Sequence, residues 1–182
     1  SDACKKNTRL FFAESLGNPK LDVLDLDKIS LESKKCKVPF MVDNTVATPA
    51  LLNPIKHGAN IVIYSLTKYI NGNGTALGGA IIDAGNFDWS NGNFPEFTSP
   101  SPAYHGLVYY EALGPAAFIA KVRVEGLRDL GAAISPFNSF QILQGLETLD
   151  IRMKKHSENA LKIANWLDSV EEVSWVNYPG LQ

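Results

Sequence analysis

Two hydroxyls and one amine stand together directly after an apolar run. Ile61–Tyr64 reads as a buried strand, and Ser65, Leu66, Thr67 and Lys68 follow it before a Gly-rich segment. Alternate residues of an extended segment face the same way, so Ser65 and Thr67 present two hydroxyls suited to a phosphate. A lysine at the end of a buried strand is expected to be poorly solvated, and a desolvated amine is a nucleophile that can form a Schiff base. Taken alone, an ordinary surface lysine would explain the segment better.

Two further apolar runs also end in polar residues. Val38–Val42 is followed by Asp43, and Arg9–Ala13 is followed by a polar turn that contains Asn18. A helix-like stretch follows each run, which is the βαβ pattern of a parallel sheet, and ligands of such sheets lie outside the carboxyl ends of the strands. As separate features, a strand-end aspartate and an Asn-Pro turn are usually a helix cap and a turn.

In this order and at near-equal spacing, the three strand ends predict one shared site. Pyridoxal phosphate could use each of them. Lys68 would react with its carbonyl, Asp43 would keep its pyridine nitrogen protonated, and Asn18 would donate a hydrogen bond to its phenolic oxygen. The hydroxyls of Ser65 and Thr67 would hold its phosphate. A nicotinamide-binding module is excluded, because no Gly-x-Gly-x-x-Gly follows the first apolar run.

Three segments of the chain closely resemble the Cys/Met-metabolism family of pyridoxal-phosphate enzymes, namely Glu14–Pro19, Val42–Pro49 and Ser65–Tyr69. Within this family, the later part of the chain is similar to the O-acetylhomoserine sulfhydrylases. The segments that carry this similarity are Gly78–Asp83, Asn86–Trp89, Ala103–Gly106, Leu127–Gly131, Ser135–Asn138, Gln144–Leu149 and Val176–Leu181. The resemblance covers nearly the whole chain.

The resemblance implies an α/β fold, the pyridoxal-phosphate-dependent transferase fold type I of aspartate aminotransferase. Residues 1–134 would form the C-terminal part of the large, cofactor-binding domain with a mainly parallel sheet. Residues 135–182 would form linker helices and the start of the small domain. The implied enzyme is a homotetramer that converts O-acetyl-L-homoserine and sulfide to L-homocysteine and acetate, with Lys68 as its catalytic residue. Cystathionine γ-synthase, a γ-lyase and a catalytically silent fragment are the alternatives.

The resemblance also implies that this chain is a fragment. The arginine that holds the substrate carboxylate, and part of the phosphate site, would lie outside it. The isolated 182 residues are therefore expected to be inactive. Asn73 stands where relatives usually carry histidine, and the resemblance implies that the main cofactor contacts do not depend on this position.

Composition favours a cytoplasmic protein without nucleic-acid or membrane partners. Seventeen basic and nineteen acidic residues give a formal net charge of -2, with no long run of one sign. Cys4 and Cys36 are too few for a disulfide framework or a zinc site. No segment approaches the roughly 20 consecutive apolar residues of a membrane span.

The pattern along the chain predicts the elements that position these residues. We expect strands over Leu10–Ser15, Phe40–Asn44, Ile61–Ser65 and Ala76–Asp83, the last antiparallel by resemblance. We expect helices over Leu24–Lys35 with Asp22 as a possible cap, over Pro49–Gly58 with Leu51, Leu52 and Ile55 inward, and over residues 114–130 and 136–170. Residues 84–106 are expected to be a loop, and Trp175–Tyr178 to begin a strand. His57, His105 and His156 are expected to have no catalytic role.

Overall fold

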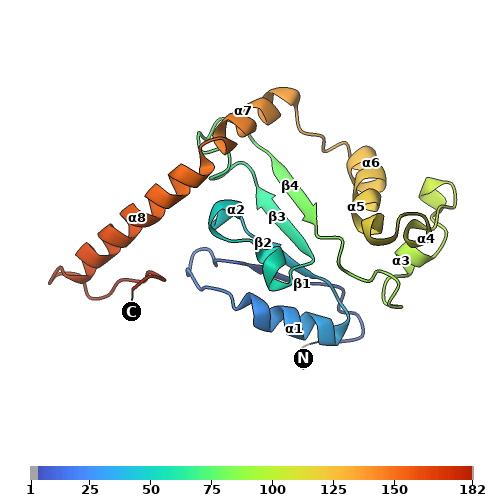
Figure 1. Ribbon diagram of the computed structural model, residues 1–182, viewed down its shortest axis with the longest axis horizontal. Helices are drawn as coiled ribbons and strands as arrows, with labels where there is room; N and C mark the ends of the chain where they lie inside the picture. The colour runs from blue at the N-terminus through green and yellow to red at the C-terminus, as the bar shows by residue number, and fades with distance from the viewer. Residues whose placement is uncertain (1–3, 182) are drawn as a thin grey trace.

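A four-stranded sheet in the order β1-β2-β3-β4 forms the centre of the chain. The computed structural model describes residues 4–181 (Figure 1). Strands β1 (Phe11–Glu14), β2 (Phe40–Asp43) and β3 (Ile61–Ser65) run parallel, and β4 (Gly79–Asp83) pairs antiparallel with β3. The predicted mainly parallel α/β arrangement with an antiparallel last strand is confirmed.

The register of the parallel strands brings their carboxyl ends together. Glu14 pairs with Asp43, and Asp43 pairs with Ile63, so Ser65 lies two residues further along β3. The polar residues that end the three apolar runs therefore lie along one edge of the sheet. This is the edge at which parallel sheets bind ligands.

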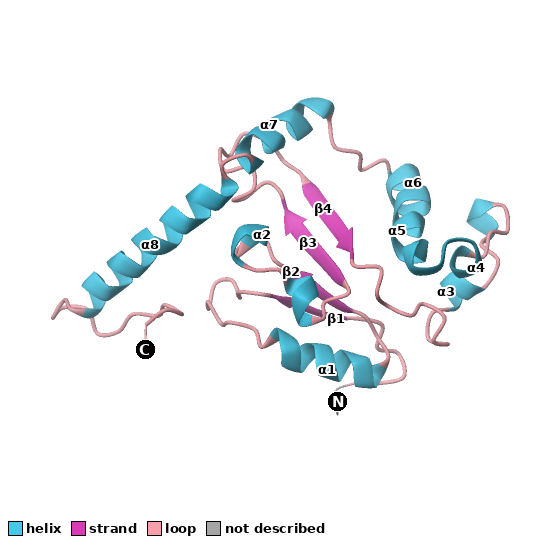
Figure 2. Cartoon of the chain, viewed as in Figure 1, coloured by secondary structure: helices cyan, strands magenta, loops and turns pink. Residues whose placement is uncertain are grey.

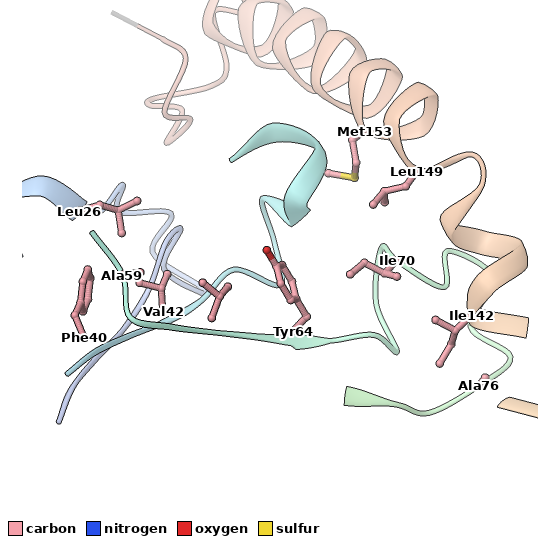
Figure 3. Packing of buried hydrophobic residues seen from close by; sticks show 11 residues of the cluster. Leu26, Phe40, Val42, Ala59, Tyr64, Ile70, Ala76, Ile142, Leu149 and Met153 are labelled. Carbon is pink, nitrogen blue, oxygen red and sulfur yellow. The ribbon is translucent and has the colours of Figure 1, made fainter. Parts of the chain in front are cut away.

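Both faces of the central strands are buried, which explains why these strands read as continuous apolar runs. Phe40, Val42 and Tyr64 on one face form a first apolar cluster, which also includes Ile70, Leu149 and Met153 (Figure 3). The opposite face carries Met41, Ile61 and Ile63 and is covered by a second apolar cluster. Its buried members outside the strands are Val38, Trp89, Phe94, Phe97, Tyr109 and Ala117.

Helix α1 (Leu26–Cys36) begins later than predicted. Its N-cap is Asp25, whose carboxylate accepts a hydrogen bond from the Lys28 amide at 3.0 Å, so the assignment of Asp22 as the cap is wrong. Val23 forms an isolated antiparallel bridge with Leu16, and this extended backbone prevents the helix from starting at Leu24.

The predicted helix over Pro49–Gly58 is divided in two. Helix α2 (Thr48–Leu51) ends at Leu52, whose backbone is extended, and a 3-10 turn (Pro54–His57) follows and ends at Gly58, with φ 85°. Because the two pieces do not share one helical face, Leu51 is 51% exposed and the prediction that it points inward is wrong.

Short helices cover the rest of the second face and connect it to the C-terminal part. The predicted loop contains α3 (Pro95–Thr98) and the 3-10 segment Pro102–Tyr104, and the residues after it form 3-10, α and π segments. These are the 3-10 segment Gly114–Ala116, helices α4 (Tyr109–Leu113), α5 (Ala117–Lys121) and α6 (Arg128–Leu130), and the π segment Val122–Leu127. Figure 2 shows α3–α6 gathered at one side of the molecule.

The C-terminal part contains two helices rather than one. Helix α7 (Pro136–Leu146) is followed by α8 (Leu149–Asp168), which extends away from the sheet (Figure 1). Leu149 and Met153 of α8 are buried in the core, whereas Leu146 of α7 is 44% exposed. The strand predicted over Trp175–Tyr178 is absent from the described structure, and Trp175 is 76% exposed. No helix among residues 4–181 is long and apolar enough to cross a membrane.

A partly buried carboxylate, Glu125, connects the segments that cover the second face of the sheet. Glu125 accepts hydrogen bonds from the Ser101 hydroxyl and the Tyr109 hydroxyl, both at 2.7 Å, and from the Lys121 ammonium. The bonds from Lys121 and Tyr109 lower the pKa of Glu125 to about 2. Burial and the neighbouring Glu125 carboxylate raise the pKa of Tyr109 to about 12.

Glu125→Gln is expected to lower the free energy of unfolding and to make this free energy less dependent on pH under acidic conditions. A carboxylate whose pKa falls on folding stabilises the native state above its unfolded pKa, and this contribution disappears as pH falls through the folded pKa. The wild-type free energy of unfolding should therefore drop between pH 4.5 and about 2, and the variant should lose about 1–3 kcal/mol at pH 7. Urea unfolding at several pH values tests this, with the exposed Glu111→Gln as control. If the free energy of unfolding of Glu125→Gln fell between pH 4.5 and about 2 as steeply as that of the wild type, Glu125 would not be the source of this pH dependence.

Candidate functional site

A pocket of about 870 Å³ opens at the carboxyl ends of the parallel strands. All five residues predicted from the sequence, Asn18, Asp43, Ser65, Thr67 and Lys68, line this one pocket. Residues from the turns and from α8 complete its wall: Glu14, Leu16, Gly17, Leu21, Thr45, Val46, Tyr69, Gly72, Gly74, Arg152 and His156. The tertiary structure thus gathers the strand ends into a single site.

Asp43 is held at the strand end by the next turn. Its Oδ1 accepts a hydrogen bond from the Thr45 amide at 2.9 Å, and the Thr45 hydroxyl oxygen accepts one from the Ser65 amide at 2.8 Å. These bonds connect the ends of β2 and β3. The second oxygen of Asp43 has no hydrogen-bond partner among residues 4–181, so it can accept a bond from a ligand.

A buried polar network lies next to Asp43 and fixes the same strand ends. The Ser15 hydroxyl donates to Asn44 Oδ1 at 2.7 Å, and Asn44 Nδ2 donates to the Leu52 carbonyl at 2.9 Å and to the Tyr64 hydroxyl at 3.2 Å. Asn44 is fully buried. Because satisfied buried polar groups specify one arrangement, the network sets the relative positions of the three strand ends.

Thr67 and Ser65 differ in how free their hydroxyls are. Thr67 Oγ1 accepts a hydrogen bond from the Gly78 amide at 3.1 Å and can donate to the Gly78 carbonyl at 3.3 Å, which ties the turn to the entry of β4. Within the described part of the chain, the Ser65 hydroxyl makes no hydrogen bond. Ser65 is therefore the hydroxyl that is directly available to a ligand.

Lys68 lies in the turn that follows β3, and its side chain is exposed. The expectation that the end of a buried strand would desolvate this lysine is wrong for this structure. The strand ends at Ser65, and the turn carries Lys68 beyond the packed sheet onto the wall of an open pocket. Any reactivity of Lys68 toward a ligand would therefore depend on its location in the pocket and not on burial by the described residues.

Asn18 lies in the exposed turn after β1. Its amide donates to Glu14 Oε2 at 2.7 Å, and the Asn18–Pro19 peptide bond is cis. The turn is closed by the Leu21 amide, which donates to the Gly17 carbonyl at 2.8 Å. Unlike the backbone amide, the side-chain amide of Asn18 makes no hydrogen bond to any described residue, so it is available to a ligand in the pocket.

Helix α8 contributes residues that sequence reasoning missed. The rings of His156 and Tyr69 lie 5.6 Å apart at 51°, and both residues line the pocket together with Arg152. His156 therefore has an aromatic neighbour on the pocket wall, and the expectation that it has no catalytic role stays a prediction. More than eighty residues separate Tyr69 from His156, and no local pattern in the sequence signals this contact.

The chemistry of the pocket fits pyridoxal phosphate. An amine (Lys68), a carboxylate with an unpaired oxygen (Asp43), a free hydroxyl (Ser65) and a guanidinium (Arg152) line one cavity. The volume of about 870 Å³ lies within the range of small-molecule pockets. An anionic phosphate, a carbonyl and a basic ring nitrogen would each find a complementary group here.

Comparison with known proteins gives a consistent result along the whole chain. The family described as "Cys/Met metabolism PLP-dependent enzyme" matches residues 1–182. The chain is 55% identical over 187 residues to O-acetyl-L-homoserine sulfhydrylase of Leptospira meyeri, covering 98% of this chain and 42% of that protein. It is 48% identical over 179 residues to homocysteine/cysteine synthase of Saccharomyces cerevisiae, covering 97% and 40%. The chain thus spans about two fifths of the length of these relatives.

Solved structures resemble the chain over its full length. A putative O-acetylhomoserine (thiol)-lyase (metY) from Campylobacter jejuni superposes with a TM-score of 0.93 at 44% identity, covering 99% of this chain and 45% of that one. That structure contains N'-pyridoxyl-lysine-5'-monophosphate. The metB structure from Corynebacterium glutamicum gives a TM-score of 0.74 at 33% identity, covering 100% of this chain and 39% of that one.

Proposed function

We propose that this chain, which belongs to the Cys/Met metabolism PLP-dependent enzyme family, is part of an enzyme that makes L-homocysteine from O-acetyl-L-homoserine and sulfide. In this γ-replacement acetate leaves the γ-carbon and sulfide takes its place. The observation that carries the proposal is the convergence of Lys68, Asp43, Ser65, Thr67 and Asn18 on one pocket. The sulfhydrylase and homocysteine synthase names of the relatives support the choice of substrates.

Each of the five residues has a proposed part in holding the cofactor. Lys68 would bind it covalently through its amine, and Asp43 would accept a hydrogen bond from the protonated ring nitrogen. Ser65 would donate its hydroxyl to the phosphate. Thr67 would do so by turning its hydroxyl hydrogen away from the Gly78 carbonyl, a bond of 3.3 Å that is easily exchanged. Asn18 would donate its amide to the phenolic oxygen.

Lys68 would also move protons during the reaction. Bound pyridoxal phosphate supplies an electron-withdrawing ring that stabilises negative charge on the substrate carbon. Once the substrate amine has replaced Lys68 on the cofactor, the amine of Lys68 is free. It would then act as the base that takes a proton from Cα and transfers protons at Cβ. Its exposed position in a turn beside Tyr69 gives the side chain room to do both.

The acceptor assay tests this function against the alternatives within the family. The protein that carries this chain, loaded with pyridoxal phosphate and given O-acetyl-L-homoserine, is expected to form homocysteine with sulfide as acceptor. Product analysis by mass spectrometry would distinguish the reactions. Cystathionine as the main product with cysteine as acceptor would favour a cystathionine γ-synthase, and deamination without any acceptor would favour a γ-lyase.

The remaining properties of the enzyme are proposals from family membership. We propose that residues 1–134 belong to the large domain and residues 135–182 to linker helices and the start of the small domain. We also propose that the enzyme assembles as a homotetramer and works in the cytoplasm on small-molecule substrates. Size-exclusion chromatography with light scattering would test the assembly.

A further inference from the structure

One guanidinium joins the turn that carries Lys68 to the junction of α7 and α8. Arg152 Nη1 donates a hydrogen bond to the Tyr69 carbonyl at 2.7 Å, and Nη2 donates to the Gly145 carbonyl at 2.7 Å. Nη2 also lies 3.4 Å from the Ile70 carbonyl, and Nε donates to the Thr148 hydroxyl at 3.0 Å. All of the nitrogens of this planar group therefore have acceptors, which fixes its orientation.

Two glycines permit the close approach of these segments. A Cβ atom on Gly72 would lie 2.7 Å from Cζ of Arg152, and φ of Gly72 is +73°. A Cβ atom on Gly145 would lie 2.0 Å from the Asn71 carbonyl oxygen. The turn and the helices thus pack backbone against backbone, with Arg152 between them.

The turn has internal support that does not depend on Arg152. The Lys68 amide donates to the Ser65 carbonyl at 3.2 Å, and the Gly72 amide donates to the Lys68 carbonyl at 2.8 Å. The Ile70 side chain is 4% exposed and packs in the first apolar cluster. Removing the guanidinium should therefore leave the turn folded, while its carbonyls lose the bonds that hold them to α7 and α8.

The charge of Arg152 remains available to the pocket. Arg152 forms no ion pair with a carboxylate among residues 4–181, and its bonded acceptors are neutral carbonyl and hydroxyl oxygens. The Gly145 carbonyl belongs to the last turn of α7, where the helix dipole favours a cation. A half-buried positive charge on the pocket wall favours an anionic ligand.

We propose that Arg152 is a positioning residue. It orients the turn that carries Lys68 toward the pocket, and it contributes positive charge to the pocket. This inference rests on the proposed function, because it assigns Arg152 a part in binding the cofactor through Lys68. It makes Arg152 neither a base nor a substrate ligand. The junction of α8 with the turn is thereby part of the working site.

The test compares Arg152→Met with Arg152→Lys and with Lys154→Met, an exposed residue of the same helix. Each variant is made in the protein that carries this chain and is titrated with pyridoxal phosphate. We expect Arg152→Met to weaken cofactor binding roughly tenfold, because the turn of Lys68 is held less firmly and the pocket loses a positive charge. We expect kcat to fall about 10- to 100-fold with little change in KM, because misplacement of a reacting group costs turnover.

A spectroscopic signature separates this role from a purely structural one. In Arg152→Met the midpoint of the pH titration of the visible cofactor band should move to higher pH, because a nearby positive charge disfavours protonation. Arg152→Lys should restore this midpoint, because lysine keeps the positive charge. It should restore only part of kcat, because lysine lacks the planar guanidinium. Gly72→Ala, which displaces the guanidinium without removing its charge, should lower kcat without moving the midpoint.

The outcomes decide the inference separately from the enzyme's identity. The inference would be overturned if Arg152→Met had the same cofactor affinity, titration midpoint and kcat as Lys154→Met. Should Arg152→Met fail to fold, Arg152→Lys decides: wild-type cofactor affinity and kcat overturn the inference, and a lowered kcat at the wild-type midpoint supports it. Absence of cofactor binding in the wild type, or a product other than homocysteine, would instead count against the proposed function.

Discussion

Lys68→Ala is expected to abolish the covalent attachment of pyridoxal phosphate and to lower turnover by at least ~10³-fold. Lys68 lines the same pocket as Asp43 and Ser65, and its side-chain amine makes no hydrogen bond to the described residues, so this amine is free to react. Borohydride treatment followed by intact-mass measurement and peptide mapping would locate the attachment. The wild type should gain one cofactor mass on the peptide that contains Lys68, and the variant should gain none.

Lys56→Ala is the matched control for this experiment. Lys56 is an exposed lysine in the 3-10 turn Pro54–His57 and does not line the pocket. Its replacement should leave the reducible chromophore and the turnover unchanged. A reducible adduct that persists in Lys68→Ala, on whichever lysine it is found, would refute the assignment of Lys68.

Asp43→Asn is expected to lower kcat by ~10²- to 10³-fold while the fold is preserved, because a preorganised charge in the site is lost. In the wild type, the Thr45 backbone amide donates to Asp43 Oδ1 at 2.9 Å. The side-chain oxygen of the asparagine can still accept this bond, so the strand end should stay in place. What disappears is the negative charge that would keep the ring nitrogen protonated. Cofactor attachment to Lys68 should survive, which distinguishes this variant from Lys68→Ala.

Asp88→Asn offers a close control, since Asp88 Oδ1 accepts the same kind of hydrogen bond, from the Ser90 amide at 2.9 Å, in an exposed loop outside the pocket. Thermal unfolding should show that both variants fold, and steady-state kinetics should show a loss of turnover only in Asp43→Asn. Turnover of Asp43→Asn within threefold of the control would mean that Asp43 only caps the turn.

The site residues on the strand ends could be predicted because their signals are local. An apolar run followed by Asp43, or by Ser65 and Lys68, marks the end of a buried strand, and parallel strands place such ends side by side. The register of Glu14 with Asp43 and of Asp43 with Ile63 agrees with this expectation. The family resemblance rests on the same short segments.

Boundaries and breaks of helices were predicted less well. Asp25 rather than Asp22 caps α1, because the bridge between Leu16 and Val23 keeps the preceding residues extended. The interruption at Leu52 and the division between α7 and α8 likewise depend on how these segments pack against the rest of the chain. Propensity alone does not contain that information.

The sequence by itself determined the mainly parallel sheet, the polar strand ends and the chemistry they offer, since these follow from patterns a few residues long. Only the tertiary structure decided that Lys68 is exposed on the pocket wall and that Arg152 and His156 of α8 lie beside its turn. Those contacts join residues more than eighty positions apart. They arise because the apolar side chains of Leu149 and Met153 pack with Ile70 in the first cluster, which draws α8 to the turn and so completes the site.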